Sequence, residues 1–192
     1  MQKLEETGQS DNTIILFISD HGWHLGGQSM WSKTTNYEID TRVPLIFRVP
    51  KLAENGRKSN SLVELIDIYP TLCDLANISI PKIIQGKTLK PIFVDEKVKV
   101  KDVAFSQFPR GPKEDYLDFY SINRMGYAMR TDEYRYVRWI DFTSKKIIAE
   151  ELYDLRTSLV ETENIVKKPE QADKLNLLRD IFNKNLVINV KQ

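Results

Sequence analysis

Residues 13–18 read Thr-Ile-Ile-Leu-Phe-Ile and show no alternation of polar and apolar positions. A run of this kind is typical of a strand that is buried on both faces, as in a parallel sheet. It is followed by Asp20 and His21, and ligand sites of parallel α/β sheets lie just beyond the carboxyl ends of the strands. A second apolar run, residues 43–49, predicts another strand. The pattern therefore predicts an α/β domain with a candidate site at the junction after the first strand.

The middle of the chain predicts a helix and then a connecting loop. Apolar residues at Ile68, Leu72 and Leu75 share one face of a helix that begins at Asp67, its expected N-cap. Residues 82–101 are rich in lysine and have no periodic pattern, so we expect a solvated loop that crosses between two domains.

The remaining residues predict an antiparallel sheet and a closing helix. We expect strands at 102–108, 126–131, 134–139 and 151–154, and a helix at 169–185. The two middle strands flank a short polar turn, which is typical of a hairpin. The expected division is therefore residues 1–100, part of a parallel α/β domain, and residues 101–192, a small antiparallel α+β subdomain.

Composition narrows the functional classes. The chain has 192 residues and a net charge of +1, which gives no bulk electrostatic case for binding nucleic acid or an anionic membrane surface. Its single cysteine, Cys73, excludes an internal disulfide and a cysteine-based zinc site. No window approaches the roughly 18 apolar residues of a membrane span, and the first residues have no signal-peptide pattern.

The side chains after the first strand carry the candidate chemistry. Asp20 offers a hard oxygen ligand and His21 a nitrogen ligand, while Gly22 lets the backbone turn sharply. Lys33 is a cation suited to an oxygen of sulfate or phosphate, although an ordinary surface lysine fits the same pattern. His24 is either a proton donor to a leaving group or a polar loop residue. Two metal ligands are fewer than a calcium ion needs, so the metal site is incomplete in these residues.

Several motifs in order give the chain a family resemblance. They are Ser19-Asp-His-Gly-Trp-His-Leu-Gly26, Trp31-Ser-Lys33, Thr41-Arg-Val-Pro-Leu-Ile46, Asp67-Ile-Tyr-Pro-Thr-Leu72, Phe105-Ser-Gln-Phe-Pro-Arg110, and Met125-Gly-Tyr-Ala-Met-Arg-Thr131 with Tyr134-Arg-Tyr136. Together they resemble the sulfatases of the alkaline-phosphatase-like superfamily, and most closely the iduronate-2-sulfatase branch. The resemblance covers residues 12 to about 164. It implies an α/β fold: the C-terminal part of the catalytic parallel-sheet domain, followed by a small antiparallel subdomain.

The resemblance also implies roles for individual residues. Asp20 and His21 match the family's second pair of Ca²⁺ ligands, and Lys33 matches the lysine that holds the substrate sulfate. Trp23 and His24 fall in the loop that lines the pocket. Gln107 and Arg110 match a segment that is characteristic of the iduronate-2-sulfatase branch, and the resemblance implies that they bind substrate.

The same resemblance indicates what these residues lack. Sulfatases of this family use a formylglycine made from a cysteine in a Cys-x-Pro-x-Arg motif, and Cys73 is followed by Asp-Leu-Ala instead. No catalytic nucleophile is therefore expected here. We expect a C-terminal fragment that is inactive alone, with the remaining metal ligands in an N-terminal part, which a separate chain could supply. The family is exported to the periplasm or outside the cell, or is lysosomal, and its substrates imply a sulfated carbohydrate as partner.

The sequence departs from the family pattern at two further places, and two alternative functions remain open. Gly27-Gln28 stands where the family usually has an acidic residue, and Ser158-Leu159 replaces the usual Asp-Pro. One alternative function is a phosphatase or phosphodiesterase of the same superfamily, which usually needs more histidine ligands than the two in this chain. The other alternative is a non-catalytic remnant or binding module with exposed apolar sheet edges.

Overall fold

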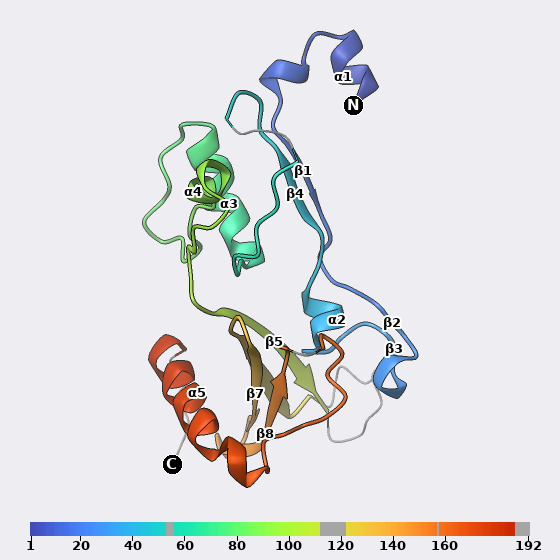
Figure 1. Ribbon diagram of the computed structural model, residues 1–192, viewed down its shortest axis with the longest axis vertical. Helices are drawn as coiled ribbons and strands as arrows, with labels where there is room; N and C mark the ends of the chain where they lie inside the picture. The colour runs from blue at the N-terminus through green and yellow to red at the C-terminus, as the bar shows by residue number, and fades with distance from the viewer. Residues whose placement is uncertain (53–55, 112–121, 157, 187–192) are drawn as a thin grey trace. The chain divides into compact units, whose positions relative to one another are not determined.

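The computed structural model describes residues 1–52, 56–111, 122–156 and 158–186. Figure 1 shows the course of the chain. Its internal contacts define two compact units, each described here by itself. Unit 1 comprises Met1–Asp20 and Val43–Asp102, and unit 2 comprises His21–Arg42 and Val103–Gln192.

The helices and strands follow the chain in a mixed α and β order. Unit 1 contains the helices α1 (Gln2–Glu6), α3 (Ile68–Leu75) and α4 (Lys90–Val94) and the strands β1 (Ile15–Ile18) and β4 (Leu45–Arg48). Unit 2 contains the helices α2 (Glu38–Thr41) and α5 (Ala172–Asn185) and the strands β2 (His24–Leu25), β3 (Trp31–Ser32), β5 (Ala104–Arg110), β6 (Arg124–Arg130), β7 (Tyr134–Asp141) and β8 (Ile147–Asp154). Within the described ranges, none of these helices combines the length and the apolar character that a membrane crossing requires.

The two apolar strands of unit 1 pair with each other. β1 and β4 are antiparallel, with Phe17 opposite Ile46 and Leu16 opposite Phe47. Phe47 packs edge-on against Phe93 of α4, so one face of the ribbon is covered. On the other face Phe17 is 61% exposed and Ile46 59% exposed. Both expected strands therefore form, but the described residues supply neither the parallel neighbours nor the cover on both faces that the apolar pattern predicted.

The predicted helix in unit 1 forms as α3, with Asp67 at its N-cap position as expected, although the Asp67 side chain bonds to other groups. Asp67 precedes the helix but makes no side-chain cap bond to it. Its carboxylate accepts hydrogen bonds from the backbone N–H groups of Glu64 and Lys87, both at 2.8 Å, and forms an ion pair with Lys101. The fully buried Asp67 thus connects the residues around the start of α3 to the chain on both sides of α4.

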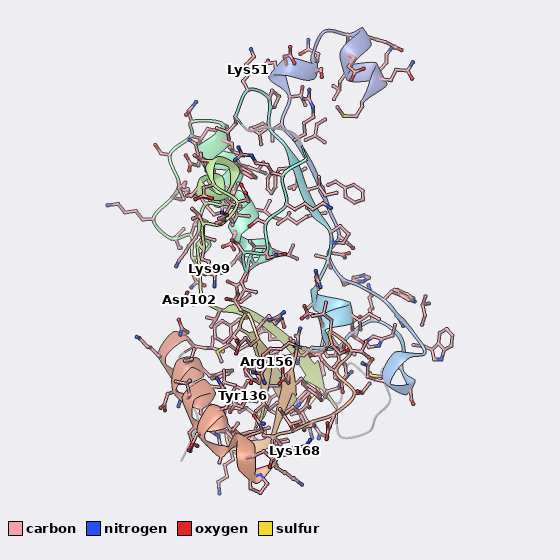
Figure 2. The ribbon with its side chains drawn as sticks, viewed as in Figure 1. Lys51, Lys99, Asp102, Tyr136, Arg156 and Lys168 are labelled. Atoms are coloured by element: carbon pink, nitrogen blue, oxygen red, sulfur yellow. The ribbon has the colours of Figure 1, made fainter. Side chains whose placement is uncertain are left out.

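Unit 2 is built on one antiparallel sheet in the order β5-β6-β7-β8. Successive side chains of a strand point to opposite faces, so each strand contributes to both sides of the sheet. One face packs against α5 and forms the core, whose buried members are Val103, Met129, Tyr134, Tyr136, Leu152, Ile165, Leu175, Leu178 and Phe182. Figure 1 shows α5 alongside the sheet, and Figure 2 marks Tyr136 on β7 beside it. The predicted antiparallel sheet and closing helix both form.

The opposite face of the sheet is covered by the segment of residues 21–42. Asn36 of this segment donates from Nδ2 to the carbonyl of Gly126 at 3.1 Å, and Glu38 forms an ion pair with Arg135 of β7. These contacts explain why the segment groups with unit 2. The buried polar groups of residues 21–42 thus find partners on the later sheet, while the division expected at residue 100 stays a prediction.

The core tyrosine on β7 predicts a loss of stability in alkali. Burial raises the pKa of Tyr136 to about 12, and the hydrogen bond to the Glu150 carboxylate also raises this pKa. A tyrosine in the unfolded chain has a pKa of about 10. The contribution of Tyr136 is thus fully present below pH 10, and it should be lost at about 1.4 kcal/mol per pH unit as the pH rises from about 10 to about 12. In denaturant unfolding at a series of pH values, Tyr136→Phe should show a shallower slope than wild type, and an unchanged slope would contradict this assignment.

Candidate functional site

The junction after β1 is fixed by a glycine. The backbone N–H of Gly22 donates to the carbonyl of Asp40 at 2.8 Å. A Cβ at position 22 would lie 1.8 Å from the carbonyl oxygen of Ile39, so only glycine fits against α2 here. The exposed Asp20 and the half-buried His21 precede this contact, and the division between the two units falls between them.

His21 presents one ring nitrogen as a lone pair. Its Nδ1 lies 2.7 Å from the carbonyl oxygen of Gly22, and because a carbonyl only accepts, Nδ1 carries the proton. The Nε2 atom is then the acceptor, and the Nζ atom of Lys33 lies 2.7 Å from it. The structure therefore brings two of the expected site residues, His21 and Lys33, into direct contact.

The donor set at this junction fits part of a metal site. An imidazole whose Nδ1–H is fixed by a hydrogen bond, as in His21, is the form that ligates metal ions through Nε2. Asp20 adds a carboxylate next to it in sequence. Within the described residues, no group of three or more His, Cys, Asp or Glu side chains is placed to hold a metal ion. The role of Asp20 and His21 as two ligands of a larger set therefore stays a prediction.

The backbone on either side of Lys33 adopts uncommon conformations. Ser32 and Thr34 have φ angles of 75° and 89°, in the left-handed region that a β-branched residue such as Thr34 rarely enters. The short hairpin of β2 and β3 precedes this point, with Leu25 opposite Trp31. Surrounding structure must hold such a backbone in place, and the contacts of His24, Thr35 and α2 do so.

His24 is the centre of a buried polar cluster. Its side chain is fully buried, its Nε2 lies 3.1 Å from Thr35 Oγ1, and its Nδ1 lies 3.3 Å from the carbonyl of Gly27. Thr35 donates from its backbone N–H and from Oγ1 to Asp40 Oδ2, at 2.8 and 2.6 Å. The Thr35 hydroxyl proton is thus donated to Asp40, so the hydroxyl oxygen accepts a hydrogen bond from the N–H of His24 Nε2. The structure gives His24 a place inside the protein, where it positions the Lys33 segment.

A buried ion network holds the next residues of the segment to the sheet. Arg135 is 1% exposed, and its guanidinium contacts the carboxylates of both Glu38 and Glu161 and the carbonyl of Asn36. The backbone N–H of Glu38 donates to Glu161 Oε2 at 2.5 Å, and Arg130 pairs with Glu38 at 3.2 Å. Burial raises the pKa of Glu161, while the charge of Arg135 lowers it. Two arginines thus neutralise two buried carboxylates.

The remaining expected site residues lie in three different places. Trp23 is 50% exposed, and its ring centroid lies 6.1 Å from that of His21. Gln107 and Arg110 are both on β5, where Gln107 pairs with Tyr127 on the face that packs against α5. Because the two positions differ by an odd number of residues, Arg110 lies on the other face, the one that the segment 21–42 covers. The structure thus separates Gln107 from Arg110.

Six residues that hold the segment 21–42 in place are not predicted by the sequence pattern. They are Thr35, Asn36, Glu38, Asp40, Arg135 and Glu161, all of them buried. Their partners lie far apart in the sequence, 99 residues in the case of Arg135 and Asn36. The available signal was weak, because a charged residue within a strand pattern, such as Arg135, is normally solvated. For Gln107 and Arg110 the alternation of a strand was a usable signal.

Comparison with known proteins gives a consistent set of relatives. The family profile described as N-sulphoglucosamine sulphohydrolase, C-terminal, matches residues 26–186. The iduronate 2-sulfatase of Homo sapiens is 29% identical over 234 residues, which cover 93% of this chain and 42% of that protein. The N-acetylglucosamine-6-O-sulfatase of Bacteroides thetaiotaomicron is 32% identical over 182 residues, which cover 93% of this chain and 31% of that protein.

Solved structures agree with these relatives. A protein solved in complex with its substrate D-glucosamine-2-N,6-O-disulfate superposes with a TM-score of 0.81 and 31% identity over 95% of this chain and 36% of its own. A phosphonate monoester hydrolase from Silicibacter pomeroyi gives a TM-score of 0.80 and 26% identity over 95% of this chain and 36% of its own. The chain thus spans between about a third and two fifths of the length of these proteins.

The buried carboxylate of Asp40 predicts a measurable loss of stability on substitution. Asp40→Asn removes a charged acceptor of two hydrogen bonds from Thr35, which should cost about 1.5–3 kcal/mol in the free energy of unfolding. Denaturant unfolding measures the change, and the Thr35 amide resonance should shift with it. Asp180→Asn, an exposed position on α5, is the control and should stay within about 0.5 kcal/mol of wild type. Equal effects of the two substitutions would show that Asp40 does not hold this segment.

Proposed function

This chain belongs to the sulfatase family, where it corresponds to the C-terminal part, and from that premise we propose that it supplies sulfate-binding and metal-binding groups to a sulfuric ester hydrolase. The observation that carries the proposal is the contact between Lys33 Nζ and His21 Nε2. It places a cation suited to a sulfate oxygen directly against the lone pair of a metal-ligand imidazole. Few structural roles require these two groups to meet in a half-buried place.

The chemistry follows from what each group donates. The Lys33 ammonium donates to a sulfate oxygen and offsets charge that grows on the sulfate in the transition state. When it does so, Lys33 no longer donates to Nε2 of His21, which is the atom that we propose as a metal ligand. Asp20, which precedes His21 in the sequence, is proposed to supply a carboxylate ligand. A bound divalent cation, Ca²⁺ in our proposal, would polarise and neutralise the sulfate oxygens.

The nucleophile is not part of the contribution that we propose for this chain. The 192 residues contain no Cys-x-Pro-x-Arg motif, and Cys73 is buried within α3. We propose that these residues are inactive alone and that hydrolysis needs the formylglycine and the other metal ligands of a complete sulfatase. Trp23, exposed beside His21, is proposed to contact the substrate at the opening of this site.

We propose a sulfated uronic acid or a polysaccharide that contains it as the substrate, in the manner of an iduronate-2-sulfatase. The similarity to iduronate 2-sulfatase supports the uronic acid, and the similarity to N-acetylglucosamine-6-O-sulfatase supports a sulfated carbohydrate more generally. Degradation of glycosaminoglycans in an exported or lysosomal compartment fits this substrate class.

A second candidate is hydrolysis of a phosphonate or phosphate ester. The superposition on a phosphonate monoester hydrolase favours it, because the same cradle for a tetrahedral anion serves both esters. Parallel assays of a complete enzyme on an aryl sulfate and an aryl phosphonate separate the two. We expect the higher kcat/KM for the sulfate, and the reverse order would select the second candidate.

Substitution of the proposed sulfate-binding lysine tests the main proposal. In a complete enzyme that contains these residues, Lys33→Ala should raise the barrier by at least about 2 kcal/mol, or roughly 30-fold in kcat/KM, because a charged hydrogen bond to the transition state is lost. The matched control is Lys82→Ala, which removes an exposed lysine from a loop of unit 1 and should leave kcat and KM unchanged. Unchanged kinetics of Lys33→Ala would remove Lys33 from the site.

Metal affinity of the isolated chain provides a separate test. Calcium takes about 6–8 oxygen ligands, and Asp20 and His21 provide only two groups. Calorimetric titration of the 192-residue chain with Ca²⁺ should therefore show weak binding that Asp20→Asn weakens further. Sub-micromolar affinity would contradict the proposal that the remaining ligands lie outside these residues.

A further inference from the structure

Unit 2 contains a pocket that the proposed sulfate site does not use. It has a volume of about 190 Å³ and lies on the sheet face opposite α5. Its lining comes from the segment 21–42 and from β5, β7 and β8: Met30, Thr35, Asn36, Tyr37, Arg110, Arg135, Val137, Trp139 and Glu151. The volume is below the roughly 300–1,000 Å³ of sites for drug-sized ligands, so it suits a single ring.

A glycine of the sheet lies against two of the residues that line the pocket. A Cβ at Gly126 would lie 2.7 Å from Asn36 Nδ2 and 2.8 Å from two ring carbons of Trp139. Gly126 and Trp139 are paired across β6 and β7, so both are on the face that the pocket occupies. The absence of a side chain at position 126 therefore lets the indole of Trp139 and the amide of Asn36 come together over the sheet.

One buried polar atom in the lining lacks a partner. The Asn36 side chain is 7% exposed, and its amide orientation is fixed because Nδ2 donates to the Gly126 carbonyl at 3.1 Å. The Oδ1 atom of Asn36 then has no hydrogen bond within the described part of the chain. An unsatisfied buried acceptor costs free energy, which a ligand that donates a hydrogen bond recovers. The flexible Met30, also in the lining, can move to admit such a donor.

The other lining groups supply a second hydrogen-bond acceptor, aromatic surface and positive charge. Glu151 accepts hydrogen bonds from Trp139 Nε1 at 2.7 Å and from the Tyr153 hydroxyl at 2.8 Å, which fixes its carboxylate as a second acceptor. Trp139 and Tyr37 provide aromatic surface, and Arg110 provides positive charge. Acceptors, an aromatic face and a cation besides the Arg135 that is paired with Glu38 and Glu161 together match a hydroxylated ring that carries an acid group.

We propose that this pocket binds one acidic pyranose unit of a glycan, with a ring hydroxyl donating to Asn36 Oδ1, the ring against Trp139 and the carboxylate toward Arg110. A simple anion such as sulfate does not suffice, because it has no proton to donate to Asn36. The identity of the ligand class rests on the proposed sulfatase function, while the pocket and its unpaired acceptor do not. The segment that carries Asn36 also carries Lys33, three residues earlier.

The three tryptophans of the chain allow a direct binding test. The full 192-residue chain is titrated with D-glucuronic acid, and the indole N–H resonances of Trp23, Trp31 and Trp139 are followed by NMR. Saturable movement of the Trp139 resonance supports the proposal. Movement of only Trp23 or Trp31, or no movement at all, overturns it. Inorganic sulfate is the matched probe without a hydroxyl donor, and an equal response of Trp139 to sulfate also overturns it.

Two variants separate the parts of the proposal. Gly126→Ala fills the space between Asn36 and Trp139 and should weaken binding at least tenfold. Arg110→Gln should weaken glucuronic acid about tenfold but leave methyl β-D-glucoside nearly unchanged, because that ligand has no carboxylate. Arg156→Gln, at an exposed arginine beside Asp154, is the control and should bind like wild type. Wild-type affinity of both Gly126→Ala and Arg110→Gln would place the ligand elsewhere.

Failure here and failure of the proposed function give different results. Suppose that Lys33→Ala abolishes the activity of a complete enzyme, while glucuronic acid does not move the Trp139 resonance of the chain. This result would support the proposed sulfatase function and reject the proposed sugar-binding pocket. Suppose instead that glucuronic acid moves the Trp139 resonance, while Lys33→Ala leaves the activity of a complete enzyme unchanged. This result would support the proposed pocket and reject the sulfate-binding role of Lys33.

Discussion

Arg135 lies almost fully buried on β7, where its guanidinium contacts the carboxylates of Glu38 and Glu161. Buried charges are costly unless each is paired and hydrogen-bonded, and removal of one partner leaves another charge stranded. This constraint gives the segment 21–42 one position on the sheet, because its carboxylate and backbone complete the network. Both Lys33, held through Thr35, and Asn36, held by Arg135 and Gly126, depend on that position.

The position of this segment affects both proposed sites, the one for a sulfate group and the one for a sugar ring. Toward one end, the Nδ1–H of His21 fixes a lone pair at Nε2, and Lys33 occupies it. Further along, Asn36 presents an acceptor over the sheet in the pocket that Trp139 lines. A sulfate and a sugar ring are the two chemical parts of a sulfated saccharide. Membership of the sulfatase family and the two proposed sites therefore describe one kind of ligand.

Most of the helices and strands could be predicted from the sequence. The pairing of distant segments could not, because it depends on contacts that a local pattern does not contain. The apolar run before Asp20, the hairpin of β6 and β7 and the closing helix α5 follow from local patterns, and the sulfatase fold class is confirmed by solved structures with the same fold. The antiparallel pairing of β1 with β4 and the attachment of residues 21–42 to the later sheet depend on contacts between distant segments. His24 is a polar loop residue in sequence, and only the positions of Thr35 and Asp40 show that it is buried.

The protonation of the two histidines tests the central claim most directly, because the chain has no others. A long-range ¹H–¹⁵N NMR spectrum of the chain, labelled in its histidine rings, reports which ring nitrogen carries the proton. The account predicts that His21 is protonated at Nδ1, with Nε2 as the acceptor from Lys33, and that Lys33→Ala shifts the Nε2 resonance of His21 but not that of His24. It also predicts a proton on Nε2 of His24. A proton on Nε2 of His21, or a His21 resonance indifferent to Lys33→Ala, would contradict the account.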